Sequence, residues 1–159
     1  MTISASGYYG LTLVKQFNST NAGSMETTDV AVMLVLDAYT HDYDTHDFRD
    51  PDVTTTPGST PEVTQGDGYT GGGIALAATP AFTIGAPATG QVKYDSDDPA
   101  WAASTITDAM AAILYDSSGT DTTDELYMLS DFGSSVSTAN GTLTVQVATN
   151  GWFFVDYTA

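Results

Sequence analysis

Short runs of β-branched and aromatic residues recur along this chain of 159 residues, and turn-forming residues separate them. Val, Thr, Tyr and Phe favour extended strands, whereas Gly, Asn, Asp and Pro favour the turns between them. Residues 30–36 are apolar at every position, which predicts a strand buried on both faces. The sequence therefore predicts a single domain, residues 1–159, of the all-β class.

Two Asn-Gly pairs near the C-terminus predict tight turns. Residues 143–147 alternate apolar and polar side chains, Asn150-Gly151 suits a two-residue hairpin, and residues 152–157 would return alongside. Asn140-Gly141 marks an earlier turn, after a strand at about 126–132. The two turns predict a C-terminal meander, and with it an antiparallel β-sandwich with little helix.

Two further segments have a less regular pattern. At 109–114, a capped helix start at 105–108 and the propensity of Ala, Met and Leu favour a helix. The run is short, however, and every second residue from 109 to 115 would share one face of a strand. Residues 51–73 are rich in Pro, Thr and Gly, which predicts a long surface loop and a candidate contact arm.

Only three basic residues, Lys15, Arg49 and Lys93, stand against twenty acidic ones, so the formal net charge is −17. Nucleic acids and anionic membranes are held by clustered Lys and Arg, and we therefore expect neither as a partner. Repulsion within so acidic a body destabilises it unless salt shortens the Debye length, which falls to about 3 Å at 1 M. The charge predicts adaptation to high salt, and an ordinary acidic protein is the alternative.

The chain contains no cysteine, which excludes disulfides and thiolate zinc sites and leaves the compartment open. Its first residues lack a basic segment followed by a long apolar one, and no run is long enough to cross a bilayer. We expect a soluble protein without a signal peptide. Triplets at Asn18 and Asn140 match the N-glycosylation pattern, which also arises by chance.

Five residues are weak candidates for a cation site. His41 and His46 lie close together among aspartates, although such segments are usually turns capped by Asp. Asp95, Asp97 and Asp98 form an acidic segment like the loops that bind Ca²⁺ or Mg²⁺, as do residues 116–121. Neither segment has the spacing or the terminal Glu of an EF-hand, so we expect no bound cofactor.

The sequence offers little for catalysis. It has two histidines, no cysteine and no Gly-x-Ser-x-Gly motif, and the DFG at 131–133 lacks the other kinase motifs. We expect that the protein is not an enzyme.

Five short motifs punctuate residues 28–157. They are DTHDF at 44–48, GYTGG at 68–72, VKYD at 92–95 with Trp101, AILYD at 112–116 and DFG at 131–133. In this order they resemble a family of small virion structural proteins of tailed phages and other tailed viruses. The chain departs from the family pattern in its few basic residues, in AMA at 109–111 and in a longer segment at 51–65.

The resemblance implies a β-sandwich, which we expect to be immunoglobulin-like or jelly-roll-like, with a strand at 109–115. It implies a capsid decoration, cement or turret protein, made in the host cytoplasm and located on the particle surface. Its partners would be the major capsid protein or another virion protein, and further copies of itself in a homo-oligomer. Together with the acidic composition, it points to a virus of a halophilic archaeon. The alternative is a tail or receptor-binding module that recognises a host surface glycan or S-layer.

The C-terminal strand holds the two interface candidates. If Phe153, Val155 and Tyr157 continue the inward face, Trp152 and Phe154 point outward. Exposed aromatic side chains imply a partner, unless a second sheet or the loop at 51–73 covers them.

Overall fold

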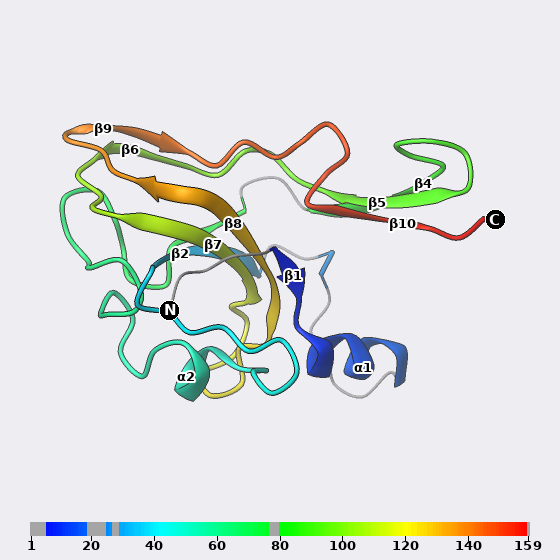
Figure 1. The fold of residues 1–159 in the computed structure, drawn as a ribbon, viewed down its shortest axis with the longest axis horizontal. Coiled ribbons are helices and arrows are strands. Elements are labelled where there is room, and N and C mark those ends of the chain that lie inside the picture. The colour runs from blue at the N-terminus through cyan, green and yellow to red at the C-terminus, as the bar shows by residue number, and fades with distance from the viewer. Residues whose placement is uncertain (1–5, 19–24, 27–28, 77–79, 159) are drawn as a thin grey trace.

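The computed structural model describes residues 6–18, 25–26, 29–76 and 80–158. These residues form a mainly β structure with antiparallel sheets and two short helices (Figure 1). In chain order the elements are β1 (Gly7–Tyr8), α1 (Gly10–Asn18), β2 (Val30–Leu36), α2 (Arg49–Asp52), β3 (Ile74–Ala75), β4 (Ala81–Ile84), β5 (Gln91–Asp95), β6 (Ala100–Ser104), β7 (Ala109–Asp116), β8 (Leu126–Val136), β9 (Gly141–Thr144) and β10 (Phe153–Asp156).

The central sheet has the order β1-β8-β7-β2-β3. β2 and β7 are antiparallel neighbours along their whole length, from the pair Val30–Asp116 to the pair Leu36–Ala109. All eight residues of β7 and the first six of β2 are buried, because side chains cover both faces of this sheet. The predicted buried strand at 30–36 is confirmed, and residues 109–115 form a strand, so the helix alternative there is wrong.

A second layer covers one face of the central sheet. On that face, Leu34 and Leu114 pack in a core cluster with Trp101 from β6 and Leu143 from β9. Figure 1 shows the β6–β9 pair stacked over β8, β7 and β2, with the β4-β5-β10 sheet beside it. The predicted all-β, antiparallel, sandwich-like fold is confirmed.

The opposite face of the central sheet is covered mostly by irregular chain. Met33 and Ile113 pack there in a second core cluster with Tyr9, Tyr39 and Val53. Neither described helix has the length or the run of apolar residues that crossing a bilayer requires.

The predicted C-terminal hairpin is wrong. Within the described chain β9 pairs with β6 and β10 pairs with β5, and β9 and β10 are not neighbours in any sheet. The C-terminal segment therefore runs antiparallel to residues 91–104 and does not fold back on itself. Gly151 allows this route, because its φ is +79° and a Cβ there would overlap the Tyr94 carbonyl oxygen. The chain bends at 139–140, with Asn140 at φ +53°, but Gly141 begins β9, which pairs with β6 and not with β8, so the predicted C-terminal meander is also wrong.

The loop at 51–73 has few regular elements, as its composition predicts, but several of its side chains are buried. Val53, Thr54, Glu62, Val63 and Tyr69 each expose 5% or less of their surface. The loop is thus anchored to the domain along its length, and a role as a contact arm stays a prediction.

Candidate functional site

Helix α1 turns apolar side chains outward. Leu13 and Val14 are exposed, and Phe17 exposes 81% of its surface, whereas the polar Thr12 is fully buried. On the inner side Lys15 donates hydrogen bonds to Glu125 at 2.9 Å and to Asp47 at 3.3 Å. A surface helix normally buries its apolar face, so the polarity of α1 is reversed. The reversal follows from the inward ion pairs, which hold Lys15 against the domain.

The β4-β5-β10 sheet presents a second apolar surface to α1. Phe82, Tyr94 and Phe153 lie opposite one another in the ladders and therefore share one face. Their rings are in contact, with centroids 4.9 Å apart for Phe82–Tyr94 and 5.5 Å for Tyr94–Phe153. The ring of Tyr8, just before α1, meets Phe153 edge-on at 5.5 Å. This row of aromatic side chains joins the small sheet to β1, the strand just before α1.

The next row on the same face of the small sheet is open to solvent. Ile84 and Val155 both lie opposite Val92, two residues along from the aromatic row. Ile84 exposes 80% of its surface and Val155 exposes 50%. In Figure 1 the outer ends of β4, β5 and β10 extend beyond the central sheet, which explains why this row is uncovered.

An apolar groove runs between α1 and the small sheet. It has a volume of about 300 Å³, and its lining is uncharged: Tyr8, Leu13, Gln16, Phe17, Met25, Phe82, Phe153 and Val155. We call the exposed apolar side chains around it the apolar face, and define it as Leu13, Val14, Phe17, Phe82, Ile84 and Val155. Monomeric proteins seldom leave so large an apolar patch in water, so this surface is the candidate functional site.

The two interface candidates from the sequence lie elsewhere. Trp152 is half-buried against the first core cluster, and its Nε1 donates a 2.8 Å hydrogen bond to Ser96 Oγ. Phe154 lies opposite Lys93, on the other face of the small sheet, and exposes 45% of its surface. Val155, which the sequence places on the inward face, does lie on the side facing α1 but remains half exposed.

Sequence reasoning missed the apolar face because it assigned no helix to residues 10–18. A signal was present: Leu13, Val14 and Phe17 have the spacing of one helix face. For Ile84 there was no such signal, because the residues that flank it in the sequence do not predict an exposed side chain.

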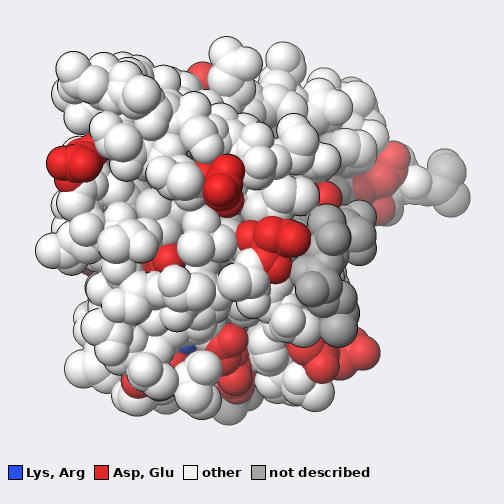
Figure 2. Space-filling view, turned by 60° about the vertical axis from the view of Figure 1, so that its left-hand side comes forward, with Lys and Arg blue, Asp and Glu red and all other residues white. Residues whose placement is uncertain are grey.

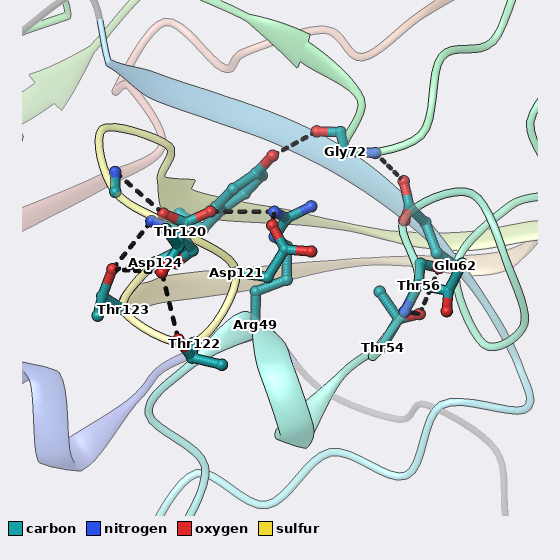
Figure 3. Close-up of polar contacts among 12 residues, drawn as sticks. Arg49, Thr54, Thr56, Glu62, Gly72, Thr120, Asp121, Thr122, Thr123 and Asp124 are labelled. Carbon is teal, nitrogen blue, oxygen red and sulfur yellow. Dashed lines mark hydrogen bonds and ion pairs between the residues drawn. The ribbon is translucent and has the colours of Figure 1, made fainter.

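A buried polar cluster occupies another part of the molecule (Figure 3). Arg49 exposes 6% of its surface and pairs through Nη2 with Asp121 and, at 3.1 Å, with Asp124. Its guanidinium carbon lies 5.2 Å from the centroid of the Tyr115 ring, and the Tyr115 hydroxyl donates a 2.6 Å hydrogen bond to the Gly72 carbonyl. Arg49 Nε has no hydrogen-bond partner among the described residues.

Glu62 continues this cluster beneath the glycine-rich segment. Its carboxylate accepts hydrogen bonds from Gly58 N at 2.6 Å, Gly72 N at 2.6 Å and the Tyr69 hydroxyl at 2.7 Å. Burial raises the pKa of Glu62, although these donors and Arg49 oppose the shift. Desolvation likewise raises the pKa of Asp124 against the pull of Arg49.

These contacts hold several loops together, and we call the cluster of Arg49, Glu62, Asp121 and Asp124 the clamp. The carboxylates of Asp121 and Asp124 face a guanidinium, and that of Glu62 faces three donors. The segment at 116–121, which is similar in sequence to a calcium loop, places Asp121 against Arg49. The arrangement connects α2, the segment at 71–73 and the loop at 120–124.

The candidate cation ligands are spread over separate contacts. His46 Nδ1 lies 2.9 Å from the Tyr39 hydroxyl, and the His41 ring lies 4.8 Å from that of Tyr43. Asp95 pairs with Lys93, and Asp98 Oδ1 accepts a hydrogen bond from Val147 N at 2.8 Å. Asp97 is exposed.

Between these histidines Asp42 accepts hydrogen bonds from the backbone of residues 44 and 45, as the turn alternative predicts. Among the described residues, no three His, Asp or Glu side chains are grouped so that they could hold a metal ion.

The molecular surface is acidic, and all the basic side chains are engaged internally. Figure 2 shows acidic side chains scattered over one face, with a trace of a basic one between them. Lys15, Arg49 and Lys93 each pair with carboxylates of the same chain.

Comparisons with protein-family models, with curated proteins and with solved structures found no match. Any function must therefore be inferred from the apolar face, the charge and the motifs.

Proposed function

We propose that the protein is a non-enzymatic structural component of a tailed-virus particle, a capsid decoration, cement or turret protein at the particle surface. The observation that carries the proposal is the apolar face. The exposed parts of its six side chains amount to roughly 500–850 Å², if a large apolar side chain offers about 150–250 Å². The largest patch on a typical monomer is about 300–600 Å², so a surface of this size supports a subunit that works in an assembly.

The charge supports a protein partner over a nucleic acid or a membrane. With a net charge of −17 and its three basic side chains paired internally, the chain offers nothing to a phosphate backbone. The major capsid protein or another virion protein is the kind of partner that remains. The resemblance of the five motifs to virion proteins is the reason for proposing a tailed-virus particle. The acidic composition supports a virus with a halophilic host.

Quantitative mass spectrometry of particles purified from an infected culture tests the proposal, with the purified chain as the calibration standard. We expect a copy number comparable to that of the shell subunits, and density for the chain on the outer shell in an image reconstruction. A chain that is absent from purified particles would contradict the proposal.

A receptor-binding module is the second candidate, and a wide hollow at one end of the central sheet favours it. This hollow, about 690 Å³, lies where β2 and β8 end and β7 begins, and its lining includes Asp37, Asp108, Thr64, Thr105 and Thr107. Carboxylates and hydroxyls are suitable partners for sugar hydroxyls. Its lining residues include no aromatic ring on which a sugar could stack, which makes this the weaker candidate. A few copies confined to the tail tip would favour it.

A further inference from the structure

We propose that the apolar face binds a second copy of this chain, forming a dimer with two-fold symmetry. The inference deepens the proposed function, since it names the partner that covers this surface. It rests on three features of the face: its size, its lack of charge and its shape.

The size of the apolar face matches one side of a specific protein interface. A standard interface buries about 800 Å² on each partner, and the six side chains of the apolar face supply most of that area. An obligate dimer interface is also more apolar than the rest of a surface, which fits the uncharged lining of the groove.

The charge distribution restricts a second copy to one route of approach. Two copies, each at −17, repel one another over most of their surfaces, and neither has an unpaired Lys or Arg with which to bridge the other. They can approach only through a face that carries no charge. A basic partner, in contrast, would be attracted to the acidic surface instead of to this face.

The apolar face offers both a projecting side chain and a hollow. Ile84 projects from the end of β4, and the groove beside α1 has room for an aliphatic side chain of that size. A two-fold axis lets each copy insert the same projection into the hollow of the other.

The two copies meet through their faces and not by pairing the edges of their sheets. β4 is the last strand of the small sheet, and the carboxylate of Glu26 accepts a 2.9 Å hydrogen bond from Phe82 N on it. An acidic side chain at a strand edge opposes pairing with the same edge of another copy. Glu26 would lie at the rim of the dimer, where salt screens it.

Sedimentation velocity over a concentration series, at low and at molar NaCl, tests the inference. We expect the full chain to form a dimer that tightens as salt rises. Phe17→Asp and Ile84→Asp should each weaken the dimer by at least about 30-fold, the effect of losing a central interface contact. Phe154→Asp is the matched control, because it adds the same charge at a half-exposed position on the opposite face of the small sheet.

Circular dichroism and thermal midpoints verify that each variant is folded. A chain that stays monomeric at molar salt, or a dimer that Phe17→Asp and Ile84→Asp leave intact, overturns the inference. So does a Phe154→Asp variant that weakens the dimer equally. A monomer that is nevertheless abundant in particles would refute this inference and leave the proposed function standing, whereas a dimer absent from particles would do the reverse.

Discussion

The Tyr69 hydroxyl donates a 2.7 Å hydrogen bond to Glu62 Oε1, and neither side chain reaches the surface. This contact joins the middle of the long loop at 51–73 to its C-terminal part inside the domain. Two backbone N–H groups, from Gly58 and Gly72, donate to the same carboxylate. A glycine-rich loop that could be flexible is thereby held by one buried acidic residue.

Replacing Glu62 should destabilise the fold. Glu62→Ala leaves two buried donors and one partly buried donor without an acceptor, which should lower the free energy of unfolding by about 3 kcal/mol. Urea unfolding in molar NaCl measures the loss. Asp97→Ala is the control: this aspartate is exposed, and its replacement should change the free energy by less than about 0.5 kcal/mol. Equal losses in the two variants would show that the Glu62 contacts do not hold the loop.

The raised pKa of Glu62 should make the protein more stable in mild acid. A carboxyl whose pKa is higher in the folded state takes up its proton there first, so stability rises as pH falls from 7 toward the ordinary carboxyl pKa. Urea midpoints at pH 7 and pH 5.5 in molar NaCl, where surface repulsion is screened, should show this rise. Glu62→Gln should reduce this dependence of stability on pH. The part that remains should come from Asp124, whose pKa is also raised. An unchanged slope in that variant would assign the effect to other groups.

Arg49 should matter more for stability than Lys93, although both form ion pairs. Arg49→Met leaves Asp124 buried without its counter-charge, which should cost about 3 kcal/mol. The Lys93–Asp95 pair is partly exposed, and Lys93→Met should cost no more than about 1 kcal/mol. Chemical denaturation of both variants gives the comparison. If Arg49→Met were as stable as the parent, the cluster in Figure 3 would not be a clamp.

The pairing of β10 with β5 should require glycine at position 151. Gly151→Ala combines a positive φ with a Cβ that would overlap the Tyr94 carbonyl oxygen, so we expect a loss above about 2 kcal/mol. Gly133 has a similar φ, +73°, but nothing lies within 4 Å of an added Cβ. Gly133→Ala should therefore cost only the backbone strain, about 1–2 kcal/mol. Thermal unfolding of the pair separates the two effects, and equal losses would contradict the close approach to Tyr94.

Folding should depend strongly on salt. With all three basic side chains paired internally, most of the twenty acidic residues repel one another, and screening removes that repulsion. The thermal midpoint should rise steeply between low and molar NaCl. Sucrose is the control, because it favours the compact state without screening charge. A midpoint that stays flat in NaCl, or that rises equally in sucrose, would remove the argument for adaptation to salt.

The sequence by itself determined the class of the fold and the character of the surface. The apolar run at 30–36 specifies a buried strand, because a short apolar run between turn signals is a local property. At 109–115 the residues alone left helix and strand open, and the family resemblance favoured the strand. The net charge is a sum over residues and needs no structure.

Only the tertiary structure decided which strands pair and which surfaces stay open. Asn150-Gly151 is compatible with a hairpin, yet β10 pairs with β5, some sixty residues earlier in the chain. The apolar side of α1 faces outward because Lys15 finds Glu125, which is 110 residues away. Glu62, Arg49 and the apolar face likewise depend on contacts between distant segments. A local pattern can state that a residue prefers burial, but the partner that buries it is chosen by the packing of the whole chain.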